Sequence, residues 1–160
     1  MPDSRDAADT ADTADTIRQV DYFSIVVPDR PGQTFRVLST LVSAGINLIA
    51  CSGFPRGRRA QIDVVPDDSR LFNRAVKKAD LAFQPKRTGF MIQGEDRPGA
   101  LAEHLNKLAV AGINVIAVDA LSPGGGHWAA IVWVKRADVR RAGGILRARR
   151  KKAVVHQLRR

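Results

Sequence analysis

The chain has 160 residues, of which 44% are hydrophobic, and a formal net charge of +10. It contains no apolar run near the roughly 20 residues that span a bilayer, and its N-terminus is acidic where a secretory signal would be basic. These features exclude a membrane segment and predict a cytoplasmic protein. The single cysteine, Cys51, excludes an internal disulfide and is expected to be a small strand residue.

The charge is unevenly distributed along the chain. Residues 1–16 hold five aspartates against one arginine, in a low-complexity Ala-Asp-Thr repeat. With almost nothing apolar to bury, residues 1–18 are expected to form a disordered acidic tail. Nine lysines and arginines and no acid follow Asp138, so the C-terminal end is strongly basic.

Residues 19–86 alternate between strand and helix patterns. Short β-branched and aromatic runs bounded by turn residues predict strands, and apolar spacings of three and four residues predict amphipathic helices. In chain order we expect a strand at 22–27, a helix with Phe35, Leu38, Leu41 and Val42 on its apolar stripe, a hairpin of strands at 48–54 and 61–65, a helix capped by Asp67, and a last strand at 83–88.

Residues 87–158 repeat this order. We expect a strand at 89–93, a helix with Leu101, Leu105, Leu108 and Ala109 on its stripe, a hairpin of strands at 115–121 and 128–134, a helix from Ala137 weakened by two glycines, and a last strand at 153–155.

Two phrases recur at one fixed distance. Asp-Arg-Pro-Gly at 29–32 returns at 96–99, and Ala-Gly-Ile-Asn at 44–47 returns at 111–114, both 67 residues later. Pro31 and Pro98 suit a first helical position, and Gly45 and Gly112 suit left-handed residues that end a helix. The repeat predicts two tandem domains, at 19–86 and 87–158, rather than an open array.

The order strand, helix, strand, strand, helix, strand, found twice, predicts an α+β fold. Each domain would be a ferredoxin-like (βαββαβ) module with its helices on one face of an antiparallel sheet. Modules of roughly 70 residues bury too little surface to be very stable alone, so we expect the two to pair closely.

A strand followed by Asp-Arg-Pro-Gly, and a helix ending in Ala-Gly-Ile-Asn that opens into a second strand, resembles the ACT domain, a regulatory module of amino-acid metabolism. The resemblance covers roughly residues 20–158, and the chain looks like the stand-alone tandem ACT proteins. It implies an amino-acid-binding regulator that pairs side by side, as a homodimer, and acts on a regulated enzyme or other protein partner. The implied ligand lies between the first turn of one unit and the second strand of its neighbour, and no cofactor is implied.

Carried over by position, the resemblance gives two sets of ligand-binding residues: Asp29, Arg30, Gly32, Asn47 and Leu48 in the first copy, and Asp96, Arg97, Gly99, Asn114 and Val115 in the second. The chemistry suits a free amino acid. The aspartates accept from an ammonium, N–H groups at a helix start meet a carboxylate, and an asparagine amide does both.

Two observations leave alternatives open. Related amino-acid-sensing modules have asparagine in the turn, where this chain has aspartate, and the often polar position two residues earlier is Val27 or Gly94. The turn could also be purely structural, with Asp29 and Asp96 satisfying N–H groups at the helix start.

Catalytic and metal-binding patterns are not found. His104, His127 and His156 have no carboxylate or thiol at ligand spacing and are expected to be solvated. Glu95-Asp96 and Asp67-Asp68 lie at helix starts, where negative charge is favoured. We therefore expect no enzyme and no metal site.

The alternative function is nucleic-acid binding, or protein interaction through the basic C-terminal segment. RNA-recognition modules share the ferredoxin-like order but stack bases on exposed sheet aromatics. Phe23, Phe90, Trp128 and Trp133 do not reproduce their motif, so a nucleic-acid partner is not favoured, although the tail could hold phosphates.

Overall fold

The structure, a computed structural model, describes residues 15–150. The predicted acidic tail up to residue 14 and the predicted strand at 153–155 lie outside these residues. The elements in chain order are β1 (Thr16–Pro28), α1 (Gln33–Ser43), β2 (Leu48–Arg56), β3 (Arg59–Pro66), α2 (Ser69–Lys78), β4 (Arg87–Glu95), α3 (Ala100–Val110), β5 (Val115–Gly124), β6 (His127–Val134), η1 (Arg136–Asp138) and α4 (Val139–Ile145).

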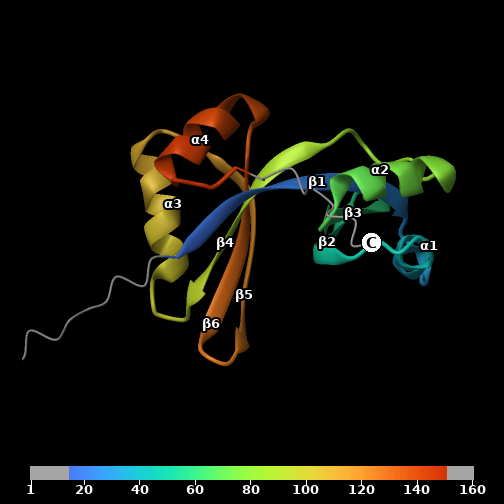
Figure 1. Ribbon diagram of the computed structural model, residues 1–160, viewed down its shortest axis with the longest axis horizontal. Helices are drawn as coiled ribbons and strands as arrows, with labels where there is room; N and C mark the ends of the chain where they lie inside the picture. Colours follow the sequence, from blue (N-terminus) through green and yellow to red (C-terminus); the bar gives the residue numbers. More distant parts are fainter. Residues whose placement is uncertain (1–14, 151–160) are drawn as a thin grey trace, which may run out of the picture.

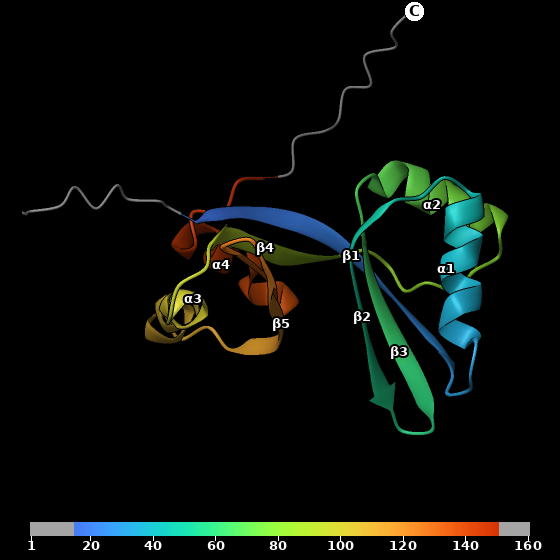
Figure 2. The ribbon, with the colours of Figure 1, turned by 90° about the horizontal axis from the view of Figure 1, so that it is seen from below.

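The six strands form one sheet in the order β2-β3-β1-β4-β6-β5, and each neighbouring pair is antiparallel. Strand β1 divides its hydrogen bonds, because Thr16–Tyr22 pairs with β4 and Phe23–Pro28 pairs with β3. Figures 1 and 2 show β1 running through both parts of the molecule, with α1 and α2 at one end and α3 and α4 at the other. We call these parts the N-terminal half and the C-terminal half.

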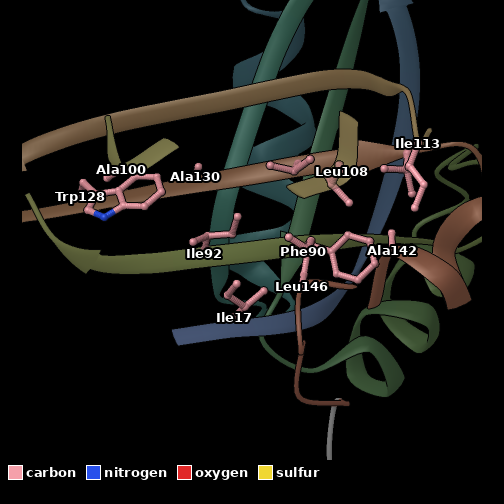
Figure 3. Packing of buried hydrophobic residues seen from close by; sticks show 12 residues of the cluster. Ile17, Phe90, Ile92, Ala100, Leu108, Ile113, Trp128, Ala130, Ala142 and Leu146 are labelled. Atoms are coloured by element: carbon pink, nitrogen blue, oxygen red, sulfur yellow. The ribbon is translucent and has the colours of Figure 1, made fainter. Parts of the chain in front are cut away.

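Each half buries its own core between helices and sheet. Phe23, Val64 and Phe72 lie in the N-terminal core, and Phe90, Ile92 and Leu108 lie in the C-terminal core (Figure 3). A third cluster on the opposite face of the strands contains Tyr22, Val65 and Trp133, with their neighbours, and so joins the two halves. The predicted class, helices packed on an antiparallel sheet, is confirmed.

One predicted strand is wrong: of the eight that were expected, seven fall within the described residues, and the structure has six there. Residues 81–86 form no strand and touch β1 through one backbone bond, from Gln84 N to Ser24 O (2.7 Å). The place beside β4 is taken by Thr16–Tyr22, so residues 16–18, expected in the tail, are strand. Arg149 forms an isolated parallel bridge with β1 through backbone bonds to Ile17 and Gln19 (both 2.9 Å).

The repeated turns cap α1 and α3 differently from the prediction. Gly32 and Gly99 are the N-cap residues, with φ of 85° and 84°, so Pro31 and Pro98 precede the helices. A left-handed N-cap suits glycine, which has no Cβ to clash. The predicted helix ends are confirmed, since Gly45 and Gly112 have φ of 71° and 69°.

Three other local predictions need correction. Asp68, not Asp67, caps α2 by accepting bonds from the backbone N–H groups of Arg70 and Leu71. In α1 the side chains of Phe35 and Val42 are 73% and 72% exposed, and Val37 is buried in their place. Residues 136–138 form a 3₁₀ turn, so the last helix begins at Val139.

No helix within residues 15–150 is long and apolar enough to cross a membrane.

Candidate functional site

The second repeated turn, Asp96–Gly99, is hydrogen-bonded to the β5–β6 hairpin. Asp96 accepts a hydrogen bond from Ser122 Oγ through Oδ2 (2.6 Å), and its backbone N–H donates to Gly126 O (2.8 Å). The side chain of Asp96 therefore has a structural partner, while the carboxylate remains exposed to solvent. This arrangement holds the start of α3 next to the end of β5.

An open groove of about 510 Å³ lies between this turn, the start of α3 and the end of β5. Its polar lining includes Asp96, Arg97 and Ser122. Its apolar lining consists of Ala100, Leu101, Ala102, Leu105, Ala120, Leu121 and Trp128, and Gly99 completes the wall. Negative charge, positive charge, helix-start N–H groups and apolar surface thus meet in one depression.

A buried polar cluster lies beside the groove. The carboxylate of Asp15 receives two bonds from the Arg97 guanidinium (both 3.1 Å) and one from His104 Nε2 (2.7 Å). The side chains of Asp15 and His104 are 2% and 5% exposed. Arg97 also pairs with Glu103 (2.7 Å), so Arg97 connects the groove to the buried acid.

Gly94 makes room for this carboxylate. A Cβ built on Gly94 would overlap the Asp15 side chain and lie 3.4 Å from Asp15 Cα. The equivalent positions in the N-terminal half, 67 residues earlier, are Val27 for Gly94 and Val37 for His104, and both valines lie in the apolar core. The two halves therefore differ at the same place, with valines in one and an ion pair in the other.

The cluster shifts the titration of its members. Burial raises the pKa of the Asp15 carboxyl, but the hydrogen bonds from Arg97 and His104 and the charge of Arg97 outweigh it and leave this pKa below its usual range. The bond to Asp15, then that to Glu103, raises the pKa of the Arg97 guanidinium. The folded protein therefore favours an ionised Asp15–Arg97 pair.

The expectation of solvated histidines is wrong for His104. Its side chain is buried, stacks on Trp128 at a centroid distance of 6.0 Å, and has no partner for Nδ1 among residues 15–150. Two features of the sequence could have indicated that His104 is buried: this residue falls on the apolar face of α3, and a glycine, Gly94, stands in the preceding strand. Asp15 could not be found because it lies in a tract with no apolar pattern. No group of three metal-ligating side chains comes together among the described residues.

The remaining predicted residues do not join the groove. Asp29, Arg30 and Gly32 are exposed at the start of α1. Asn47 and Leu48 follow the other end of that helix, where Asn47 O accepts from Asp67 N (3.1 Å). An 11-residue helix is about 16 Å long, so the turn and the asparagine of one half lie far apart.

The C-terminal half repeats this separation. The turn precedes the 11-residue helix α3, and Asn114 and Val115 follow it. Figures 1 and 2 place α1 at the opposite end of the molecule from α3. Strand β5 contacts the N-terminal half through a hydrogen bond from Ser52 Oγ to Asp119, but no described residue of that half lines the groove.

The four aromatic residues considered for base stacking are all buried. Phe23, Phe90, Trp128 and Trp133 are between 0% and 5% exposed. They therefore offer no stacking surface to a nucleic acid.

No protein-family model matches this sequence, and no curated protein is significantly similar to it. Solved structures are similar in fold. Protein BT0572 from Bacteroides thetaiotaomicron is 18% identical, with a TM-score of 0.71 over 82% of this chain and 88% of that one. The regulatory subunits of aspartate kinase from Thermus thermophilus and Thermus flavus are 16% and 17% identical, each with a TM-score of 0.56 over 84% of this chain, and over 93% and 92% of theirs.

Two of these neighbours are regulatory subunits of aspartate kinase. The resemblance to ACT proteins inferred from the repeated phrases is thus confirmed at the level of the fold.

Proposed function

We propose that the protein is a regulator built of two ACT-like modules that binds a small amino acid. The observation that carries this proposal is the groove at the second turn, where Asp96, Arg97 and the start of α3 surround an apolar floor. The modules would correspond to residues 19–86 and 87–158, and the first part of β1 would belong to the sheet of the second module.

The groove offers complementary chemistry to each part of a zwitterion. The exposed carboxylate of Asp96 can accept from an ammonium. The N–H groups of Leu101 and Ala102, in the first turn of α3, can meet a carboxylate, whereas that of Ala100 donates to Arg97 O. Leu101, Leu105 and Leu121 can take up an aliphatic side chain. The volume of about 510 Å³ falls in the range of small-molecule sites.

We propose that a second copy closes the site. Strand β5 is an edge of the sheet and is exposed after Val115, with a contact to the N-terminal half at Asp119, which accepts from Ser52 Oγ. At its start, Asn114 is exposed and Val115 is half-buried. In a homodimer they would form the opposite wall of the groove. Asp29, Arg30 and Gly32 could form a second site with Asn47 and Leu48 of the partner.

A regulatory role is supported by the fold of the neighbours, two of which are regulatory subunits of aspartate kinase. Such a protein need not catalyse a reaction. A ligand that binds one arrangement of modules more tightly shifts the population toward it, and an enzyme or other protein partner would sense that shift.

Thermal melting against the common amino acids tests the proposal. A ligand at 100 times its dissociation constant adds about 2.7 kcal/mol, a rise of about 5 to 10 °C for a chain of this size. Asp96→Ala and Asn114→Ala should remove the part of the rise that comes from this groove, whereas Asp67→Ala, which changes an exposed acid outside the groove, should keep the full rise. A panel with no rise for any amino acid contradicts the proposal.

A further inference from the structure

A second cavity lies where the two halves meet, away from the groove at the second turn. It measures about 670 Å³ and is more enclosed than that groove. Its walls come from β1, from the chain entering β4, from the start of β5 and from the β6–α4 connection. The lining residues used below are Tyr22, Lys86, Arg87, Ile116, Lys135 and Arg136.

Four cationic side chains line this cavity, and no acidic side chain does. Of these four cations, only Lys86 has a carboxylate partner within residues 15–150, Asp21 at 3.7 Å. Arg87, Lys135 and Arg136 form no ion pair within that part of the chain. Converging cations in a concave site raise the local positive potential and attract anions.

An adjacent cavity of about 590 Å³ extends the positive region. It shares Arg136 and Val139 with the first and adds Arg140 and Arg150. The acids nearest in sequence are Asp21 and Asp138, and neither lines either cavity. The positive charge is therefore continuous along the start of α4.

The cavity also has an apolar part, formed by Pro85, Ile116, Val134 and Val139. Tyr22 adds its ring, and its hydroxyl lies close to Arg87. Burial raises the pKa of that hydroxyl, and the hydrogen bond with Arg87 opposes the rise. Charge on one side and apolar surface on the other suit a ligand that carries both.

We propose that this cavity binds a small molecule that combines a phosphoryl group with an apolar or aromatic part, the chemistry of a nucleotide. A phosphoryl group carries about −1.5 to −2 at pH 7 and several acceptor oxygens, which matches clustered arginine and lysine donors. A zwitterionic amino acid fits poorly, because four cations repel its ammonium. The site is thus distinct in chemistry from the groove that contains Asp96, and it does not depend on that proposal.

The structure supplies a reporter for binding. Trp133 packs edge-on against Tyr22, with ring centroids 5.6 Å apart at 77°. A ligand against Tyr22 should change the fluorescence of Trp133, and Trp133→Phe should remove that change while Trp128 remains. Calorimetry of the same titrations gives the affinity independently of the reporter.

The full chain is titrated at constant ionic strength with inorganic phosphate, pyrophosphate, AMP and ATP. We expect the nucleotides to bind more tightly than the inorganic ions, because only they use the apolar wall. The double variant Lys135→Ala, Arg136→Ala should weaken nucleotide binding at least tenfold, and Arg87→Ala should weaken it independently. The double variant Arg58→Ala, Arg74→Ala loses the same charge from exposed positions of the N-terminal half and should change binding less than twofold.

Three results would overturn the inference. The first is no nucleotide binding at millimolar concentration, by fluorescence and by calorimetry, in a sample shown to be folded by circular dichroism. The second is an equal loss of affinity in both double variants, which indicates diffuse attraction. The third is binding of an oligonucleotide that AMP and ATP do not displace, which indicates a nucleic-acid surface.

Discussion

Removing the carboxylate of Asp15 is the sharpest test of the buried polar cluster. In Asp15→Ala, His104 loses the partner of Nε2, and its Nδ1 already has none among the described residues. Arg97 keeps its contact with Glu103 and is 37% exposed, so water can replace the bonds that it loses. The two partners of Asp15 therefore respond differently.

The expected loss of stability follows from these exposures. The lost contact with Arg97 adds little, because the partly exposed guanidinium is rehydrated by water and keeps its contact with Glu103. A buried polar group left without a partner costs about 1 to 3 kcal/mol, which is the part assigned to His104. We expect Asp15→Ala to lower the free energy of unfolding by about 2 kcal/mol and Tm by about 4 to 8 °C.

The assay is urea unfolding and thermal melting at pH 7, with Asp29→Ala as the matched control, because Asp29 is an exposed acid. In the double variant Asp15→Ala, His104→Val, the histidine that lost its partner is replaced by the residue found at the equivalent position, Val37. That variant should be more stable than Asp15→Ala alone. A melt of Asp15→Ala within 1 °C of the unaltered protein, or no gain in the double variant, would refute this account of the cluster.

Three further results are expected. Gly94→Ala should destabilise the protein by an amount similar to Asp15→Ala and add little in that background, measured by a double-mutant cycle, because its Cβ displaces the same carboxylate. Since the pKa of Asp15 is lowered in the folded state, its contribution to stability should be lost as pH falls through that pKa. Urea unfolding from about pH 5 downward should show a steeper loss for the unaltered protein than for Asp15→Ala. Phe72→Ala should cost about 3 to 5 kcal/mol in urea unfolding, because Phe72 is fully buried against Phe23 and Phe83; a loss below 1 kcal/mol would contradict that packing.

Most of the secondary structure could be predicted from the sequence because its signals are local. The two hairpins follow from strands flanking turn residues, and the helix ends follow from Gly45 and Gly112. The stripe of α1 was misread because Phe35 and Val42 are as apolar as the buried Val37, and composition alone cannot say which face meets the sheet.

The division of β1 between two halves could not be predicted, because strand pairing is a long-range choice. Nothing in Thr16–Tyr22 identifies β4, some 70 residues later, as its partner. For the same reason, only part of the predicted site comes together in the structure. Asp96, Arg97 and Gly99 meet in one groove because they are neighbours in sequence, whereas Asp15 reaches Arg97 only through the path of β1.

The sheet of the C-terminal half is complete only when Thr16–Tyr22 of β1 pairs with β4, and these residues are synthesised before that half. If residues 87–150 were produced alone, the edge of β4 that pairs with Thr16–Tyr22 would lie bare, and such edges recruit other strands and promote aggregation. During synthesis, Thr16–Tyr22 cannot pair until β4 has been made. Pairing these segments closes a loop of roughly 70 residues, which should slow folding. Dissecting the protein at its internal repeat would therefore sever a sheet rather than release an autonomous unit.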